Sequence, residues 1–169
     1  MFASRLNYQI KPFVSWHPDP EAKSHDAFSI QWKGYLSYCF PPFALINRVL
    51  RKIEAEQVTV MLVFPHWTMQ TWYPRLLRLL TARPVLLPWA DDLLYLPHRP
   101  GERHPLAGRL TLCAALLSGN PLAREAFHTT LPTSLWKPGD QPRRSSTSQP
   151  CQDGYISAAE GRYIQFDQL

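Results

Sequence analysis

The sequence has few cysteines, and neither its cysteines nor its histidines follow a metal-binding pattern. The three cysteines, Cys39, Cys113 and Cys151, are widely spaced, so they form neither a disulfide framework nor a zinc-type CxxC motif. The six histidines show no HxH or HxxxH spacing, so we expect no zinc site. A reducing, intracellular setting is the simplest expectation for such cysteine usage.

Long apolar runs and several well-known catalytic motifs are also missing. The longest apolar run, "LTLCAALL" at 110–117, is too short to span a bilayer. The opening "MFASRLNYQIK" has no apolar core of a signal peptide, so we expect no membrane partner. The sequence contains no glycine-rich phosphate loop and no GxSxG motif. We also find neither the paired aspartates of a polymerase nor a tyrosine-recombinase catalytic set.

Proline, apolar residues and positive charge are abundant instead. The 169 residues are 45% apolar, enough for one domain with a real core. Seventeen prolines are about twice the usual share, which indicates short elements that end abruptly. The formal net charge of +5 suits an anionic partner such as nucleic acid. A basic domain without such a partner is the other interpretation of this charge.

Apolar patterning alternates between strands and helices over residues 11–88. "VTVMLVF" at 58–64 is continuously apolar and β-branched, which is typical of a strand buried on both faces of a parallel sheet. The other elements that we expect are strands at 11–16, 35–39 and 85–88 and helices at 21–32, 43–53 and 71–84. This alternation predicts a layered α/β fold, a small, partly parallel sheet flanked by helices.

Two more helices are expected after this unit, and then the composition changes. Leu106, Leu110, Ala114 and Leu117 recur at helical spacing. Asn120 followed by Pro121 is a typical N-cap and first-turn pair. Residues 137–154, "KPGDQPRRSSTSQPCQDG", hold almost nothing to bury, so we expect a disordered linker there.

The stretch "YCFPPFALI" at 38–46 predicts a strand, a rigid turn and a helix. Pro41 and Pro42 lack backbone donors and fix φ, so the strand must stop before them. A rigid turn at the end of a strand is a common place for a binding site in α/β proteins.

Several stretches occur in an order that resembles one family. They are "FASRLNYQIKPFVSWHPDPEA", "DAF", "FPPFALINRVLRKI", "FPHWTMQTWYPRLL", "HPL", "LSGNPL" and "LPTSLW". This ordered set resembles the segment of DIRS-type retrotransposon pol polyproteins that lies between RNase H and the tyrosine recombinase. The match covers residues 2–136 and continues weakly beyond. It implies a methyltransferase-like domain at 1–136, a linker at 137–154 and the leading edge of a recombinase region at 155–169.

That polyprotein segment is itself similar to phage-type Dam DNA adenine-N6 methyltransferases. The resemblance implies a Rossmann-like sheet, S-adenosylmethionine as the methyl donor and DNA as the substrate. The family turn reads Asp or Asn, Pro, Pro, aromatic, and its polar residue accepts hydrogen bonds from the amine of a flipped-out adenine. Pro41, Pro42 and Phe43 match this turn, whereas Phe40 stands where the acceptor is expected.

The first strand end departs from the family as well. Asn7 matches a family asparagine near the methyl donor, but the acidic residue that precedes "FAS" in relatives is missing, so the domain looks truncated at its N-terminus. We therefore expect a degenerate, inactive methyltransferase-like domain that needs no cofactor. Weak, non-specific nucleic-acid binding through Arg75 and Arg78 is expected on one helix face, together with other pol domains as partners.

Two alternatives to this interpretation remain open. One is a residual S-adenosylmethionine-dependent DNA methyltransferase, and the other is a non-functional remnant of a decayed element. Trp67, Trp72 and Tyr73 either line a cleft or pack at a strand–helix junction. Asp19, Glu21 and Asp26 indicate either metal or acid–base chemistry or, as we favour, a solvated loop and a helix start.

Overall fold

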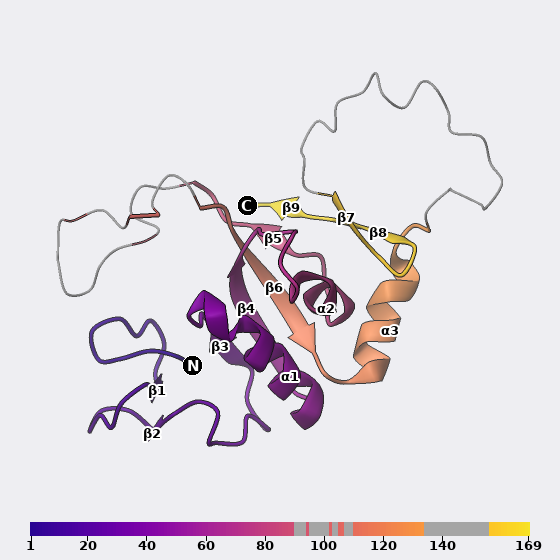
Figure 1. The fold of residues 1–169 in the computed structure, drawn as a ribbon. Coiled ribbons are helices and arrows are strands. Elements are labelled where there is room, and N and C mark those ends of the chain that lie inside the picture. Colours follow the sequence, from indigo (N-terminus) through magenta and orange to yellow (C-terminus); the bar gives the residue numbers. More distant parts are fainter. Residues whose placement is uncertain (90–93, 95–101, 103–104, 107–109, 134–155) are drawn as a thin grey trace.

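A five-stranded mixed sheet forms the centre of the computed structural model, which describes residues 1–89, 94, 102, 105–106, 110–133 and 156–169 (Figure 1). In sheet order its strands are β3 (Ser37–Cys39), β4 (Thr59–Pro65), β6 (Leu112–Ser118), β5 (Val85–Leu86) and β9 (Asp167–Gln168). β3 and β4 are parallel, β6 is antiparallel to both β4 and β5, and β9 is parallel to β5. The chain is thus of the mixed α/β class, as the alternating pattern predicts.

The predicted strand, turn and helix at 35–53 are confirmed. β3 ends at Cys39, the 3-10 turn η1 spans Phe43–Leu45, and α1 spans Ile46–Glu56. α1 buries its apolar stripe, Ile46, Val49, Leu50 and Ile53, against the sheet. Because the chain then returns as β4 parallel to β3, these elements form a βαβ unit.

The strand predicted at 58–64 is β4, but its surroundings differ from the prediction. It has a parallel neighbour on one side only, because β6 runs antiparallel along the other. Met61 is 40% exposed, so β4 is not buried along its full length on both faces. Met61 points away from the face that α1 covers, since side chains alternate along a strand.

The helix predicted through Leu106, Leu110, Ala114 and Leu117 is wrong. Residues 112–118 form strand β6, which pairs with β4 over its whole length. The run is continuously apolar, and periodicity alone cannot separate a strand from a buried helix in so short a stretch. The pairing with β4 decides the matter, because each strand satisfies the other's backbone groups.

The next two helices start as predicted. α2 spans Tyr73–Arg78, with proline in its first turn, although the pattern extends the expected helix to residue 84. α3 spans Pro121–Thr130, and the Asn120 side chain caps it by accepting a hydrogen bond from the Leu122 N–H at 3.0 Å. Such a cap contributes about 1 kcal/mol.

Residues 1–36 form a lobe beside β3, and the helix predicted at 21–32 is wrong. The lobe holds a two-stranded parallel pair, β1 (Val14–Ser15) and β2 (Ser24–His25), within loops and turns. Asp19 and Asp26 accept hydrogen bonds from the N–H groups two residues later. Such aspartate turns compete with helix formation. Trp32 anchors the lobe in the main core.

The last described residues also pack onto the core. β7 (Ile156–Ala159) and β8 (Arg162–Gln165) form a hairpin whose turn residues, Glu160 and Gly161, both have positive φ, as two-residue hairpin turns require. Ile164 and Phe166 are buried in the main core. The predicted linker at 137–154 lies outside the described residues.

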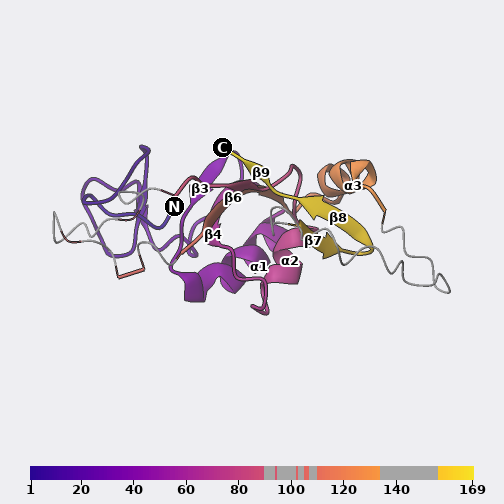
Figure 2. The same cartoon turned by 90° about the horizontal axis from the view of Figure 1, so that it is seen from above.

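Two views show how the layers lie. α1 and α2 cover one face of the sheet, the lobe of residues 1–36 lies beside β3, and α3 lies at the opposite end (Figures 1 and 2). None of the helices in the described ranges is long and apolar enough to cross a membrane.

Candidate functional site

The turns that follow the parallel strands β3 and β4 meet at one edge of the sheet. Phe43 follows β3, Trp67 follows β4, and their rings lie edge to face with centroids 5.0 Å apart. Phe40 lies 6.3 Å from Phe43. An aromatic cluster therefore occupies the carboxyl edge of the parallel strands, where α/β proteins commonly place ligands.

The proline pair shapes the backbone between these rings. Pro41 is buried and Pro42 is exposed. Pro42 is extended, with φ −50° and ψ 136°, and precedes the first turn of η1. Its carbonyl accepts a hydrogen bond from the Leu45 N–H at 2.8 Å. The pair thus ends β3 and starts the helical segment, which is a structural reason for two prolines at this point.

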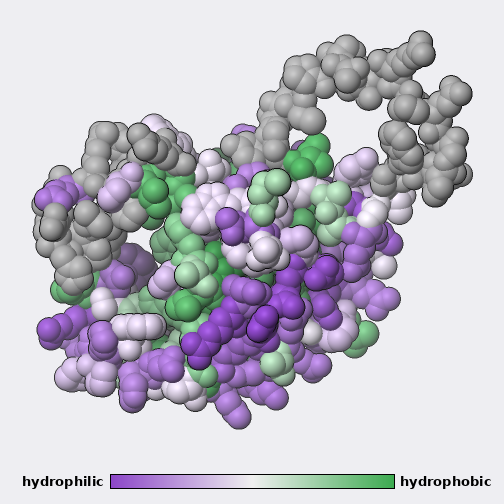
Figure 3. Space-filling view, in the orientation of Figure 1, coloured by the Kyte–Doolittle hydropathy of each residue, from purple (hydrophilic) through white to green (hydrophobic). Residues whose placement is uncertain are grey.

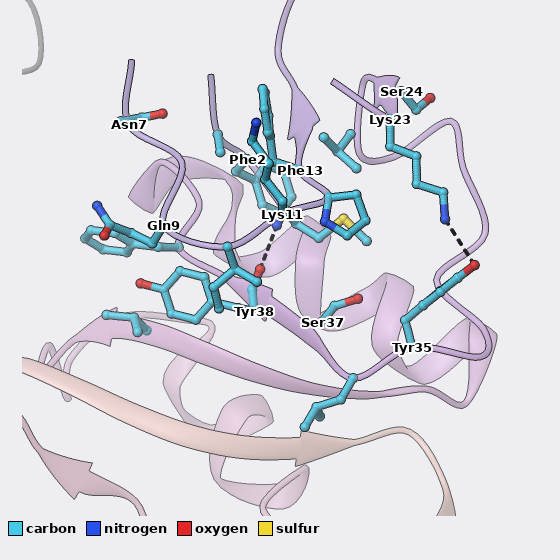
Figure 4. A pocket seen from close by; sticks show the side chains of 18 of the residues that line it. Phe2, Asn7, Gln9, Lys11, Phe13, Lys23, Ser24, Tyr35, Ser37 and Tyr38 are labelled. Atoms are coloured by element: carbon cyan, nitrogen blue, oxygen red, sulfur yellow. Dashed lines mark hydrogen bonds between the residues drawn. The ribbon is translucent and has the colours of Figure 1, made fainter. Parts of the chain in front are cut away.

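Phe40 and Asn7 line the same cavity, which has a volume of about 840 Å³. Figure 4 shows this cavity with Asn7 labelled. Phe43 is not among its lining residues. Asn7 is exposed, and its side-chain oxygen accepts hydrogen bonds from the backbone N–H and the hydroxyl of Ser4, at 2.6 and 2.9 Å. Asn7 therefore closes a turn of its own segment, while the Phe40 ring brings no acceptor to the cavity.

Two of the three aromatic residues near β4 serve the core. Trp72 and Tyr73 are 6% and 4% exposed, which supports the packing interpretation for both. Only Trp67 is exposed, at 38%. Tyr73 also connects α2 to the C-terminal hairpin, because its hydroxyl lies 2.8 Å from the Ser157 hydroxyl.

His66 follows β4 but points into an aromatic cluster. Its ring lies edge to face with Tyr73 and Phe166, at 6.0 and 5.2 Å. Burial lowers the pKa of His66 below its usual value, because a charged imidazolium is poorly solvated there. His66 thus helps to hold the C-terminal segment against α2 in its neutral form.

Arg75 and Arg78, which were expected on one helix face, differ in burial and in their partners. Arg75 is half-buried and donates to the Asn47 side chain at 3.0 Å, and it lies 3.7 Å from Glu54 of α1. Arg78 is exposed at the end of α2. Arg83 lies beyond the helix and pairs with Asp167 at 3.5 Å. Figure 3 shows hydrophilic side chains gathered over α1 and α2.

The other reactive side chains that the structure describes do not gather into a catalytic or metal-binding centre. Asp19 and Asp26 make turns, as the solvated-loop interpretation predicts, although no helix starts there. Among the described residues, no group of three potential ligands could hold a metal ion. Burial raises the pKa values of Cys39 and Cys113 to about 12, so both thiols stay protonated and unreactive.

The cavity is the feature that sequence reasoning missed. Its walls come from the N-terminal lobe and from the sheet face opposite α1. Lys11 and Lys23, which sequence patterning does not single out, are both among its lining residues, and Lys11 is exposed there. No local motif marks these residues, since the cavity depends on how the lobe folds over β3.

Comparisons with protein families, with curated proteins and with solved structures found no match for this chain.

Proposed function

We propose that the chain is a segment of a DIRS-type retrotransposon pol polyprotein and that it carries an inactive, methyltransferase-like domain. This domain is a small Rossmann-like fold that binds nucleic acid weakly and without sequence preference. One observation carries the proposal: the turn after β3 keeps both prolines and the aromatic residue of an adenine-N6 methyltransferase turn, but has Phe40 in place of the acceptor.

The arrangement of the sheet supports the proposal. The turn follows a strand of a parallel βαβ unit and precedes its helix, as a turn at a ligand-binding edge does. β6, β5 and β9 extend the same sheet beyond β4. The turn is therefore held by a five-stranded scaffold, which is how loops that carry a binding site are usually positioned.

The chemistry explains why activity is not expected. The amine of adenine is a poor nucleophile, because its lone pair is delocalised into the ring. An acceptor oxygen accepts hydrogen bonds from the amine and so directs its lone pair toward the methyl group. Phe40 has no such oxygen. Losing one preorganised polar group at a reacting centre costs about 3–4 kcal/mol, a hundredfold to a thousandfold in rate.

The first experiment measures methyl transfer. Purified protein is incubated with radiolabelled S-adenosylmethionine and adenine-containing DNA, and we expect no time-dependent label on the DNA. Phe40→Asn alone is also expected to remain inactive, because the N-terminal half of the site departs from the family as well. Clear labelling by the wild-type chain would overturn the proposal.

The residual-methyltransferase alternative would be favoured by a pocket that meets both Asn7 and Phe43. Asn7 lines the cavity together with Phe40, the residue at the acceptor position, but Phe43 is not among the lining residues. Calorimetric titration with S-adenosylmethionine separates the two hypotheses, because saturable binding that Asn7→Ala weakens would favour the alternative. Reverse transcriptase coding sequence upstream and a recombinase downstream would identify the parent polyprotein.

Nucleic-acid binding is tested on the outer surface of α1 and α2. Arg51 and Arg78 are exposed there, whereas Arg75 is partly neutralised by Glu54. Backbone contacts release counterions, so the affinity for random duplex DNA should lie on the order of 10⁻⁴ to 10⁻⁶ M at physiological salt and fall steeply as salt rises. Fluorescence anisotropy at two salt concentrations measures both effects.

The combined variant Arg75→Ala with Arg78→Ala should weaken this binding, with most of the loss coming from Arg78. Arg5→Ala, an exposed arginine in the N-terminal lobe, is the matched control. No binding at low salt would rule the idea out. Salt-insensitive binding to one preferred sequence would identify a base-reading protein instead.

A further inference from the structure

The cavity between the N-terminal lobe and the sheet has the size of a small-molecule site. Its volume of about 840 Å³ lies within the range of roughly 300–1,000 Å³ that is usual for such sites. The lobe supplies one wall and β3, β4 and β6 supply the floor, so elements distant in sequence meet around it. Figure 4 shows side chains from both parts lining it.

The floor and one wall of the cavity are apolar. Tyr38, Phe40, Val63 and Leu112 come from the sheet face that α1 and α2 leave uncovered. Phe13 comes from the lobe and is 2% exposed. Its ring is stacked on Tyr8 with centroids 4.8 Å apart. The rings of Tyr38, Phe40 and Phe13 and the aliphatic side chains that line the cavity suit the flat, apolar body of a ligand.

The described residues that line the cavity carry charge of one sign. Lys11 and Lys23 are among them, and none of these described lining residues is an aspartate or a glutamate. Within the described part of the chain, neither lysine forms an ion pair. Two cations in this part of the lining attract an anion and repel a cation.

Aromatic rings hold both ammonium groups in place. Lys23 Nζ donates to the Tyr35 hydroxyl at 3.0 Å and lies 4.2 Å from the centre of that ring. Lys11 Nζ lies 5.0 Å from the centre of the Tyr8 ring. A cation over an aromatic face is oriented without losing its charge, so both groups remain available to a bound anion.

We propose that this cavity binds a small anion with a flat, apolar body, and that Lys11 and Lys23 supply the positive charge that attracts its anionic group. A nucleoside monophosphate and an aromatic carboxylate or sulfonate share this chemistry. S-adenosylmethionine does not fit as well, because its sulfonium centre is positively charged. The inference is independent of the proposed function, since it stands on the charge and shape of the cavity alone.

The test compares ligands that differ only in the anionic group. Adenosine 5′-monophosphate and adenosine are titrated into the full chain by calorimetry. In parallel, anilinonaphthalene sulfonate, an aromatic sulfonate whose fluorescence rises when it is bound, is titrated into the chain. The monophosphate is then added, and the fall in fluorescence measures how much dye it displaces. We expect the monophosphate to bind at least tenfold more tightly than adenosine and to displace the dye. Whichever of the two anions binds more tightly shows whether the cavity prefers a nucleoside monophosphate or an aromatic sulfonate.

Variants locate the site. Lys11→Gln and Lys23→Gln should each weaken anion binding roughly tenfold, the usual effect of losing one charge-assisted hydrogen bond. Lys33→Gln is the matched control, because Lys33 is exposed in the same lobe but does not line the cavity. All variants must show the wild-type circular dichroism spectrum and cooperative unfolding.

Three results would overturn the inference. They are equal binding of adenosine and its monophosphate, equal weakening by Lys33→Gln, and no binding of either anion at millimolar concentration. The methylation assay can fail or succeed without affecting any of these outcomes, so the two proposals are judged separately.

Discussion

Replacing Gly119 with alanine should be the most damaging small change in the described chain. Gly119 lies between β6 and α3, and its N–H donates to the Val58 carbonyl at 2.9 Å. A Cβ atom at this position would lie 2.0 Å from the Ile53 carbonyl oxygen and 2.8 Å from Gln57 Cα. Both atoms belong to the backbone, so no side chain can rotate to make room.

The expected loss is about 3 kcal/mol of unfolding free energy or more, at the upper end of the range for overpacked sites. For a chain of this size, that corresponds to a fall in melting temperature of roughly 6–12 °C. Urea unfolding followed by circular dichroism measures the free energy, and thermal unfolding provides a second reading.

Gly34→Ala is the matched control because it separates strain from collision. Gly34 has φ of +86°, and a Cβ atom added there would meet nothing within 4 Å, so alanine costs only backbone strain, about 1–2 kcal/mol. We expect Gly119→Ala to be clearly worse. If Gly119→Ala were no worse than Gly34→Ala, the close approach of this turn to α1 would be refuted.

Three further predictions concern the core and its buried titratable groups. Burial lowers the pKa values of His66 and His128 below 6.5, so the unfolded state binds more protons and the free energy of unfolding should fall as pH drops below about 6.5. Urea unfolding at pH 7.5 and 5.5 tests this, and an unfolding free energy that does not change with pH contradicts it. Cys39 and Cys113, with pKa values of about 12, should not react with iodoacetamide at pH 8 until urea unfolds the chain. Peptide mass spectrometry measures the labelling, and labelling of the folded chain would count against their burial. Ile164→Ala should cost about 2–5 kcal/mol, because Ile164 is fully buried; an unchanged urea midpoint would mean that the C-terminal hairpin does not pack on the core.

The elements with a local signal were predictable from the sequence. α1 follows from its apolar stripe and from the prolines before it, and α3 follows from Asn120 and Pro121. In both cases a nearby residue fixes where the helical segment begins. β4 was predictable as a strand because its apolar, β-branched run favours strands, but the direction of its neighbours was not.

The errors came from segments whose structure depends on distant partners. β6 pairs with β4, more than 40 residues earlier in the sequence, and this pairing overrides a spacing that also fits a helix. The cavity could not be predicted either, because Lys11 and Lys23 line it only as a result of how the lobe folds. The turn at 40–43 was found because prolines and aromatic residues form a local pattern.

The pairing of β9 with β5 sets the order in which the chain can complete its fold. β5 lies near the middle of the sequence and β9 at residues 167–168, so a nascent chain must be synthesised as far as β9 before this edge of the sheet can close. Until then, the surfaces of the core that Ile164 and Phe166 cover remain accessible. Incomplete products that end before residue 156 should therefore be targets for chaperones and proteases, because they expose an apolar surface and an unpaired strand edge.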